Sequence, residues 1–181
     1  MEHTPRVLAV IIMDADGNRL VAKYYPVAAG GRTFQAGGET AYEKKLFRKT
    51  KHNHAAAVDS DAVMLDGCVA IFRARGDTFL YVVGAGHENE LLLDTVLEGL
   101  FVALTILLDG SIESRYVLSN LDIVMLAVDE LVDQGKILEV EPKTIANRVL
   151  MRGVDGTTTI TDMSIQDAMK VAQEQLIKSM S

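Results

Sequence analysis

The sequence contains no tryptophan and has few cysteines, prolines and aromatic residues. Its one cysteine, Cys68, excludes an intramolecular disulfide, so the composition does not suggest a secreted, disulfide-stabilised domain. The 3 prolines in 181 residues argue against a disordered linker protein. Because aromatic residues make up 6% of the chain, the core must be mainly aliphatic, with 8 methionines available to fill irregular gaps.

Long hydrophobic runs are also missing. The apolar stretch at residues 6–13 follows a segment that contains Glu2 and shows no small-residue cleavage site, so we interpret it as a buried strand and not as a signal peptide. The second apolar stretch, residues 100–108, is well short of the roughly 18 residues that a membrane-spanning helix needs. We therefore expect a soluble, intracellular protein with no transmembrane segment.

Basic residues are scarce outside the first third of the chain. The formal net charge is −7, but residues 1–54 hold 9 Lys and Arg against 5 Asp and Glu, a net charge of +4, and the remainder holds 9 against 20, or −11. This asymmetry argues against general nucleic-acid binding. It allows a local basic face, which is ordinarily a solvated helix surface and alternatively a contact for an acidic partner or an anionic membrane. The residues concerned are Lys44, Lys45, Arg48, Lys49 and Lys51.

Aliphatic and β-branched runs separated by short turns predict about five strands, which lie at residues 6–13, 19–25, 62–65, 67–73 and 78–83. Asp16-Gly17 supplies the positive φ angle that a tight hairpin needs between the first two. Strands joined by tight turns imply an antiparallel sheet. With helices on both faces, the predicted fold is an α+β, three-layer sandwich.

Helical spacing of apolar residues predicts helices at residues 39–52 and 89–108, and a longer one at the centre of the chain. The central helix begins between Ser114 and Asn120, and we expect Gly135 to end it as a left-handed cap before a short extended segment. Pro142 suits the first turn of a further short helix. Its predicted apolar edge consists of Ile145, Ala146 and Val149.

A last helix is predicted after the polar connection at residues 153–162, opened by a capping signal at Ser164. We interpret residues 153–181 as a linker and an amphipathic helix that follow a domain at residues 1–152. The stripe on this helix is a candidate partner surface, and packing within the chain is an equally good explanation. It consists of Ile165, Met169, Ala172 and Leu176.

Four short patterns could carry chemistry, and each has a simpler explanation. The Gly84-Ala85-Gly86 turn is weak as a nucleotide motif, and a tight strand-to-helix turn explains it. The acidic turn at residues 14–18 lacks the glutamate that an EF-hand requires at its twelfth position. His52 and His54 are too few for a metal site, and a solvated loop explains them. The carboxylates Asp129, Glu130 and Asp133 could form a site, could meet a basic partner, or could be a solvated helix end. We predict no catalytic, cofactor-binding or metal-binding residue.

Several separated segments together resemble a known family. They read IIMDADGNRLVAKYY, AYEKKLFRKT, YVVGAGHENELLLDTVLEGLF and NLDIVMLAVDELVDQGKILEVEP. In this order and spacing they are similar to the zeta subunits of coatomer and, more distantly, to the small sigma chains and medium-chain N-terminal domains of clathrin adaptors. The resemblance runs from Arg6 to about residue 152.

The resemblance implies a longin-like (profilin-like) sheet with one helix on one face and two on the other. It also implies a non-enzymatic role without cofactors: pairing with the coatomer gamma subunit within the heptameric COPI coat, on Golgi membranes to which an Arf-family GTPase recruits that coat. The implied location is the cytoplasm and the cytoplasmic face of Golgi membranes and COPI vesicles, in Golgi-to-ER retrograde and intra-Golgi transport. Alternatives are a clathrin adaptor sigma-type chain, a tethering-complex component, or a nucleotide-dependent enzyme using Gly84 and Gly86.

The residues favour a stable partner independently of the resemblance. The predicted helices carry more apolar surface than a small sheet can cover, especially at residues 91–108. Obligate interfaces commonly bury more than about 2,000 Å², and they would cover such an excess. We therefore expect the isolated chain to aggregate or to express poorly.

Overall fold

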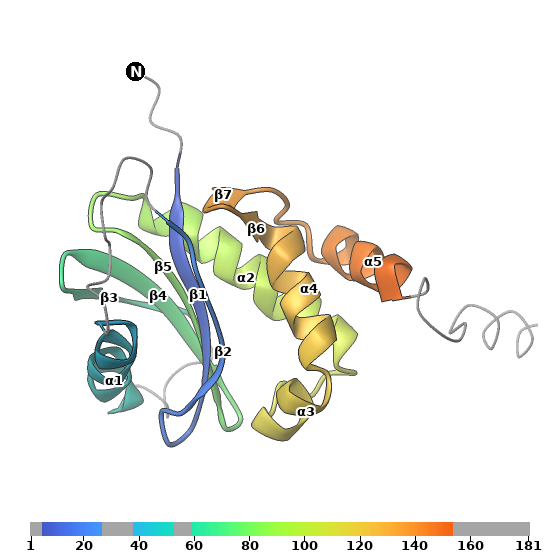
Figure 1. Ribbon diagram of the computed structural model, residues 1–181, viewed down its shortest axis with the longest axis horizontal. Helices are drawn as coiled ribbons and strands as arrows, with labels where there is room; N and C mark the ends of the chain where they lie inside the picture. Colours follow the sequence, from blue (N-terminus) through green and yellow to red (C-terminus); the bar gives the residue numbers. More distant parts are fainter. Residues whose placement is uncertain (1–4, 27–37, 53–58, 154–181) are drawn as a thin grey trace, which may run out of the picture. The chain divides into compact units, whose positions relative to one another are not determined.

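The computed structural model describes residues 5–26, 38–52 and 59–153. Five strands form one antiparallel sheet in the order β2-β1-β5-β4-β3 (Figure 1). Their bounds are β1 Val7–Asp14, β2 Arg19–Tyr24, β3 Asp61–Leu65, β4 Cys68–Arg75 and β5 Thr78–Ala85. The predicted antiparallel sheet of about five strands is therefore confirmed, with each boundary within two residues of its expected position.

Turn chemistry explains the β1–β2 hairpin. The Asp14 carboxylate accepts hydrogen bonds from the backbone N–H groups of Asp16 and Asn18, at 2.9 and 2.8 Å. Gly17 has a φ of +82° and packs under the Phe47 ring, where a side chain would not fit. The acidic turn is thus a hairpin turn, as the simpler interpretation predicted.

The two central strands, β1 and β5, are buried along almost their entire length. Alternate residues point to opposite faces, so each strand supplies two separate cores. Val10 and Ile12 belong to one core, whereas Ile11 and Met13 belong to the other. This double burial explains why these strands read as continuous apolar runs and not as alternating ones.

The second core lies under α1 (Gly38–Thr50), which covers one face of the sheet. Tyr42 and Leu46 are its buried anchors, and Phe47 packs edge-on against Phe79 with ring centroids 5.4 Å apart. The helix predicted at residues 39–52 is confirmed, and it ends at Thr50.

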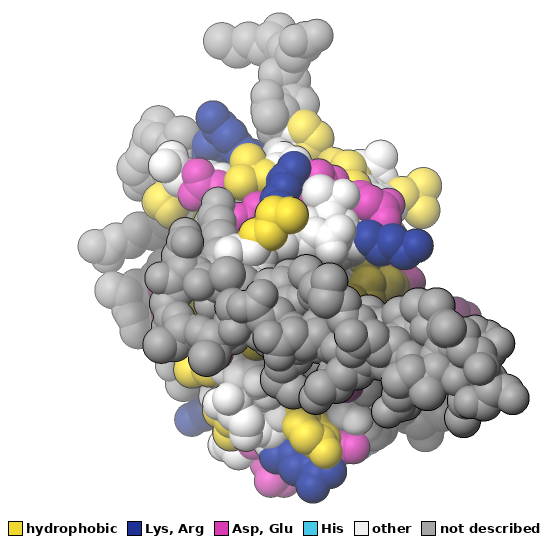
Figure 2. Space-filling model, turned by 90° about the vertical axis from the view of Figure 1, so that its right-hand side faces the viewer, with side chains coloured by type: hydrophobic (Ala, Val, Ile, Leu, Met, Phe, Trp, Pro, Cys, Tyr) yellow, Lys and Arg dark blue, Asp and Glu magenta, His cyan; other side chains and the backbone are white. Residues whose placement is uncertain are grey.

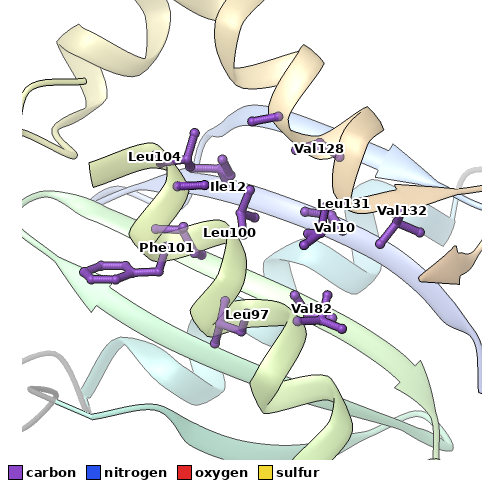
Figure 3. Close-up of a cluster of buried hydrophobic side chains, with 14 of the residues drawn as sticks. Val10, Ile12, Val82, Leu97, Leu100, Phe101, Leu104, Val128, Leu131 and Val132 are labelled. Carbon is purple, nitrogen blue, oxygen red and sulfur yellow. The ribbon is translucent and has the colours of Figure 1, made fainter. Parts of the chain in front are cut away.

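The first core lies under α2 (Glu90–Leu107) and α4 (Leu121–Leu131), on the other face of the sheet. Figure 3 shows side chains from β1, β5, α2 and α4 meeting between these layers. Asn89 begins α2, since its side chain accepts a hydrogen bond from the Leu91 N–H at 2.9 Å. One helix on one face and two on the other confirm the three-layer arrangement. Within the described ranges, no helix is both long and apolar enough to cross a membrane.

The predicted central helix is wrong in two respects. It is two helices, α3 (Ser114–Ser119) and α4, separated at Asn120. The Asn120 side chain donates to the Tyr116 carbonyl, and its φ of −124° and ψ of +39° depart from helical values. The apolar spacing continues across this break, so periodicity alone did not detect it.

The central helix also ends at Leu131, four residues before Gly135. Val132–Asp133 (β6) and Lys136–Ile137 (β7) form a small hairpin, and Gln134 and Gly135 make its turn with φ values of +48° and +78°. Gly135 is therefore a hairpin residue and not a helix cap. The start of β1 stabilises this arrangement, because the Val7 N–H donates to the Gly135 carbonyl at 2.9 Å.

The helix predicted at Pro142 is α5 (Pro142–Gly153). Its predicted apolar edge, Ile145, Ala146 and Val149, is buried. Residues from 154 onward lie outside the described ranges, and so does the predicted stripe Ile165, Met169, Ala172 and Leu176. The division of the chain at residues 152 and 153 stays a prediction.

Candidate partner interface

The inner side of α1 carries a buried ion pair. The Glu43 carboxylate is 5% exposed and contacts the Arg19 guanidinium at 2.7 Å. The Tyr24 hydroxyl donates to the same carboxylate at 2.6 Å, and burial together with this hydrogen bond raises the pKa of Tyr24. The sequence interpretation missed Glu43 because it placed only apolar residues on the inner side of the helix. These contacts hold α1 against β2 and serve the structure.

The outer side of α1 is basic. The Lys45 ammonium pairs with Asp66 at 2.9 Å, and the Lys49 ammonium donates to the Met64 carbonyl at 2.7 Å. Both lysines therefore cover the β3 edge of the sheet, where an uncovered strand would invite pairing with another chain. Lys44 and Arg48 of α1, and Lys51 directly after it, are also exposed, and the Arg48 Nε donates to the Lys44 carbonyl at 3.3 Å.

The three carboxylates near the end of α4 do not form a common site. Asp129 pairs with Lys23 on β2, and Glu130 lies near Arg148 on α5. Asp133 is exposed in β6. The prediction of a solvated helix end is also wrong for Glu130, which is 5% exposed. Because the helix ends at Leu131, its last turn points the two acidic side chains toward different basic neighbours.

Arg148 joins α4, α5 and the segment that follows β7. One guanidinium nitrogen lies 3.7 Å from Glu130 and another lies 3.4 Å from Glu139. Glu139 also accepts hydrogen bonds from the backbone N–H groups of Glu141 and Val140; these bonds lower the pKa of its carboxyl. The arrangement fixes the entry of α5, with one guanidinium between the two carboxylates.

Exposed large apolar side chains mark the opposite side of the sheet from α1. Leu118 is 55% exposed and Leu138 is 56% exposed. Figure 2 views the molecule from this side and shows hydrophobic side chains at its surface among charged ones. On the described part of α1, by contrast, no large apolar side chain is exposed. The exposed large apolar residues between the start of α2 and the segment that follows β7 are Leu91, Ile106, Tyr116, Leu118, Leu121 and Leu138.

The break between α3 and α4 concentrates three of them. Tyr116, Leu118 and Leu121 lie within six residues of sequence, and the Arg115 guanidinium lies 4.5 Å from the Tyr116 ring. We define these three apolar residues as the junction patch. Leu121 has the helical spacing of the buried residues that follow it, but it is the first residue of α4 and is 41% exposed. The sequence interpretation therefore missed the junction patch. It did not detect the break between α3 and α4, which brings these three side chains to the surface.

Asp77 holds the junction in place from the β4–β5 turn. Its carboxylate accepts a hydrogen bond from the Ser114 N–H at 2.8 Å and another from the Ser114 hydroxyl. Burial alone would raise the pKa of Asp77, but the hydrogen bonds from Ser114 outweigh it and lower the pKa. A side chain distant in sequence thus caps the first turn of α3.

The patterns considered for chemistry have structural explanations. A β-carbon on Gly84 would come within 2.7 Å of Leu93, and one on Gly86 within 2.7 Å of the Gly67 carbonyl, so close packing explains both glycines. Cys68 is buried, and burial raises the pKa of its thiol. Among the described residues, no three His, Cys, Asp or Glu side chains lie close enough to hold a metal ion. His52 is exposed, and His54 lies outside the described ranges.

Comparison with known proteins gives consistent matches along the chain. The family model of the clathrin adaptor complex small chain matches residues 6–155. Coatomer subunit zeta-1 of Oryza sativa subsp. japonica is 36% identical over 180 residues, which are 99% of each chain. Coatomer subunit zeta-1 of Bos taurus is 38% identical over 171 residues, or 94% of this chain and 90% of the relative. A chain in a homology model of the full-length AP-3 complex in a stretched open conformation superposes with a TM-score of 0.63. At 12% identity, over 82% of this chain and 94% of that one, it is a likeness of fold alone.

Proposed function

The chain belongs to the clathrin adaptor complex small-chain family and, within it, to the coatomer zeta subunits, and on this basis we propose that it pairs with the trunk of the coatomer gamma subunit. Members of this family are structural subunits of vesicle coats and not enzymes. The chain accordingly has a COPI coat role. The pairing, the transport steps and the exact surface are parts of the proposal.

The observation that carries the proposal is the uneven distribution of exposed apolar side chains. The junction patch and Leu138 lie on the side of the sheet opposite α1. Interface cores are enriched in aromatic and large apolar residues, and a Tyr with neighbouring leucines is typical of them. We propose that the gamma subunit covers this side, with the junction patch in the contact.

The proposed setting follows from the coat role. The complex would act on the cytoplasmic face of Golgi membranes and COPI vesicles, in Golgi-to-ER and intra-Golgi transport, after an Arf-family GTPase in its GTP form recruits the coat. The stripe Ile165, Met169, Ala172 and Leu176 is proposed as a second contact on the sequence pattern alone. A clathrin adaptor sigma-type role is the alternative. The identity of 36–38% to coatomer zeta subunits over 94–99% of the chain favours the coatomer role.

Co-expression with a tagged gamma trunk tests the pairing. We expect the trunk to raise the soluble yield of the chain and to co-purify with it in equal amounts. A monodisperse chain that shows no affinity for the trunk would contradict the proposal.

The double variant Leu118→Lys/Leu121→Lys tests the surface. It places two charges in the junction patch, and an apolar interface residue that contributes strongly costs at least about 2 kcal/mol when removed, so affinity should fall roughly thirtyfold or more. The matched control is Ala62→Lys/Met64→Lys, which adds two charges at exposed positions of the edge strand β3. Circular dichroism should show both variants folded. If the two variants bind the gamma trunk with equal affinity, the junction patch is not part of the interface.

A further inference from the structure

The outer surface of α1 is a second functional surface that the proposed pairing does not use. Five cations lie on it, and we define them as the basic face: Lys44, Lys45, Arg48, Lys49 and Lys51. Lys44 and Arg48 of α1, and Lys51 directly after it, fall opposite the buried Tyr42 and Leu46, and Lys45 and Lys49 flank them toward the β3 edge. The face is therefore a continuous stripe and not a set of scattered charges.

Among the described residues, the carboxylates of α1, of Asp66 and of the β1–β2 turn beside Phe47 form no ion pair with Lys44, Arg48 or Lys51. Glu43 is turned inward and is paired with Arg19 at the start of β2, so its charge is compensated there. Asp66 pairs with Lys45, and the Lys49 ammonium is directed to the Met64 carbonyl. The exposed Glu39 in the first turn is the remaining carboxylate on the described part of α1. This leaves Lys44, Arg48 and Lys51, spaced four and three residues apart, as an outward row of cations.

The charge of the rest of the chain makes this row distinctive. Residues 55–181 hold 9 Lys and Arg against 20 Asp and Glu, a net charge of −11. A protein with one basic face and an acidic remainder takes a fixed orientation at an anionic surface, because the surface attracts the face and repels the remainder.

The chemistry of the face favours a lipid surface over a protein. Protein interfaces have apolar or aromatic anchors at their centres and contain little lysine. The basic face has no exposed large apolar side chain and four lysines out of five residues. Attraction to anionic headgroups needs only positive charge close to the membrane. The face also lies on the other side of the sheet from the junction patch, so a membrane and a protein partner could be engaged together (Figure 1).

We propose that the outward row Lys44, Arg48 and Lys51 contacts the anionic headgroups of a membrane and orients the subunit with α1 toward the bilayer. This inference rests on the proposed function in a membrane coat, because that role brings the chain to a lipid surface. Each Lys or Arg close to an anionic membrane strengthens binding by about fivefold, so three of them contribute up to about 100-fold.

Vesicle flotation of the full chain tests the proposal, since bound protein rises with the vesicles and any aggregate sinks. The vesicles are phosphatidylcholine with about one lipid in three replaced by phosphatidylserine, and pure phosphatidylcholine is the lipid control. The test variant is Lys44→Gln/Arg48→Gln/Lys51→Gln. The matched control is Arg75→Gln/Lys136→Gln/Lys143→Gln, which removes three exposed cations elsewhere. Both variants change the net charge from −7 to −10.

The expected result is flotation of the original chain and of the control variant with anionic vesicles only, and at least about tenfold weaker flotation of the test variant. Binding should also weaken as salt rises, since screening shortens the range of the attraction. No flotation of the original chain, or equal loss in both variants, overturns the proposal.

Binding to the gamma trunk separates this inference from the proposed function. We expect the test variant to bind the trunk as well as the original chain does. If the test variant no longer binds the trunk but still floats with the anionic vesicles, the basic face binds an acidic protein and the membrane proposal is overturned. If the original chain floats but never binds the trunk, the pairing with gamma fails while the lipid contact stands.

Discussion

Gly99 of α2 lies directly against the carbonyl oxygen of Val140, so that a β-carbon built on Gly99 would come within 2.6 Å of that oxygen. The absence of a side chain lets the segment between β7 and α5 cross the helix at close range. A glycine in the middle of a helix normally costs stability, which indicates that the close approach compensates for it. The position of α5 therefore depends on one residue of α2.

Gly99→Ala should lower the free energy of unfolding by about 1–3 kcal/mol. Alanine favours the helix by nearly 1 kcal/mol, but the added methyl group must displace main chain, and overpacking of this kind costs more than the propensity gains. Urea denaturation measures the change. Thr95→Ala, at an exposed position of the same helix, is the control and should be nearly neutral. A rise in stability for Gly99→Ala would contradict the close packing.

Arg148→Ala should lower the free energy of unfolding by about 1–2 kcal/mol, because it removes the guanidinium that offsets the buried charge of Glu130. Arg148 is 48% exposed, and solvent screening keeps the loss below the roughly 3–5 kcal/mol of fully buried pairs. A double-mutant cycle with Glu130→Gln measures the coupling, and the double variant should lose less than the sum of the single changes. Arg115→Ala, which breaks an exposed ion pair with Glu113, should cost at most about 0.5 kcal/mol.

Asp77 should make the stability of the chain depend on acidic pH. Because its pKa is lower in the folded chain than the usual 3.8, its contribution is complete above that value and is lost as the pH falls through the folded pKa. At neutral pH, Asp77→Ala should cost about 1 kcal/mol, as the loss of a helix cap does. Thermal melts between pH 7 and about pH 3 compare the two chains. The difference between them should shrink toward acid, and a constant difference would show that the carboxylate is not the cause.

Gly135→Ala should destabilise the chain by about 2 kcal/mol. A φ of +78° costs roughly 1–2 kcal/mol for a residue with a β-carbon, and that carbon would lie 2.7 Å from the Val7 carbonyl. The neighbouring change Gln134→Gly is the control, since Gln134 also has a positive φ and glycine relieves it there. Denaturation should show opposite signs for the two variants, or a neutral result for Gln134→Gly. A neutral Gly135→Ala would contradict the tight turn between β6 and β7.

The part of the fold that could be predicted is the part set by local patterns. β1 and β5 were recognisable because buried strands need uninterrupted apolar residues, and the turn at Gly17 because hairpins need a residue that tolerates positive φ. The stripe of Tyr42 and Leu46 and the buried edge of α5 were recognisable because helical spacing brings their side chains to one face.

Contacts between distant residues decided the rest. The hairpin that follows α4 is held by the hydrogen bond from the Val7 N–H to the Gly135 carbonyl. These two residues are far apart in the sequence, so the spacing of apolar residues does not predict this contact. The break at Asn120 exposed Leu121, although its spacing matched the core residues on either side. The acidic residues Asp129 and Glu130 were apparent as charges, but their partners Lys23 and Arg148 became neighbours only through folding.

The amino-acid sequence by itself determined the composition of the core, the antiparallel sheet, the layers of helices and the family, because each of these follows from residues close together or from ordered segments of the chain. The tertiary structure alone decided which apolar side chains stay at the surface and which charges are compensated. Burial and ion pairing depend on which elements pack together, and packing joins residues that the sequence keeps far apart.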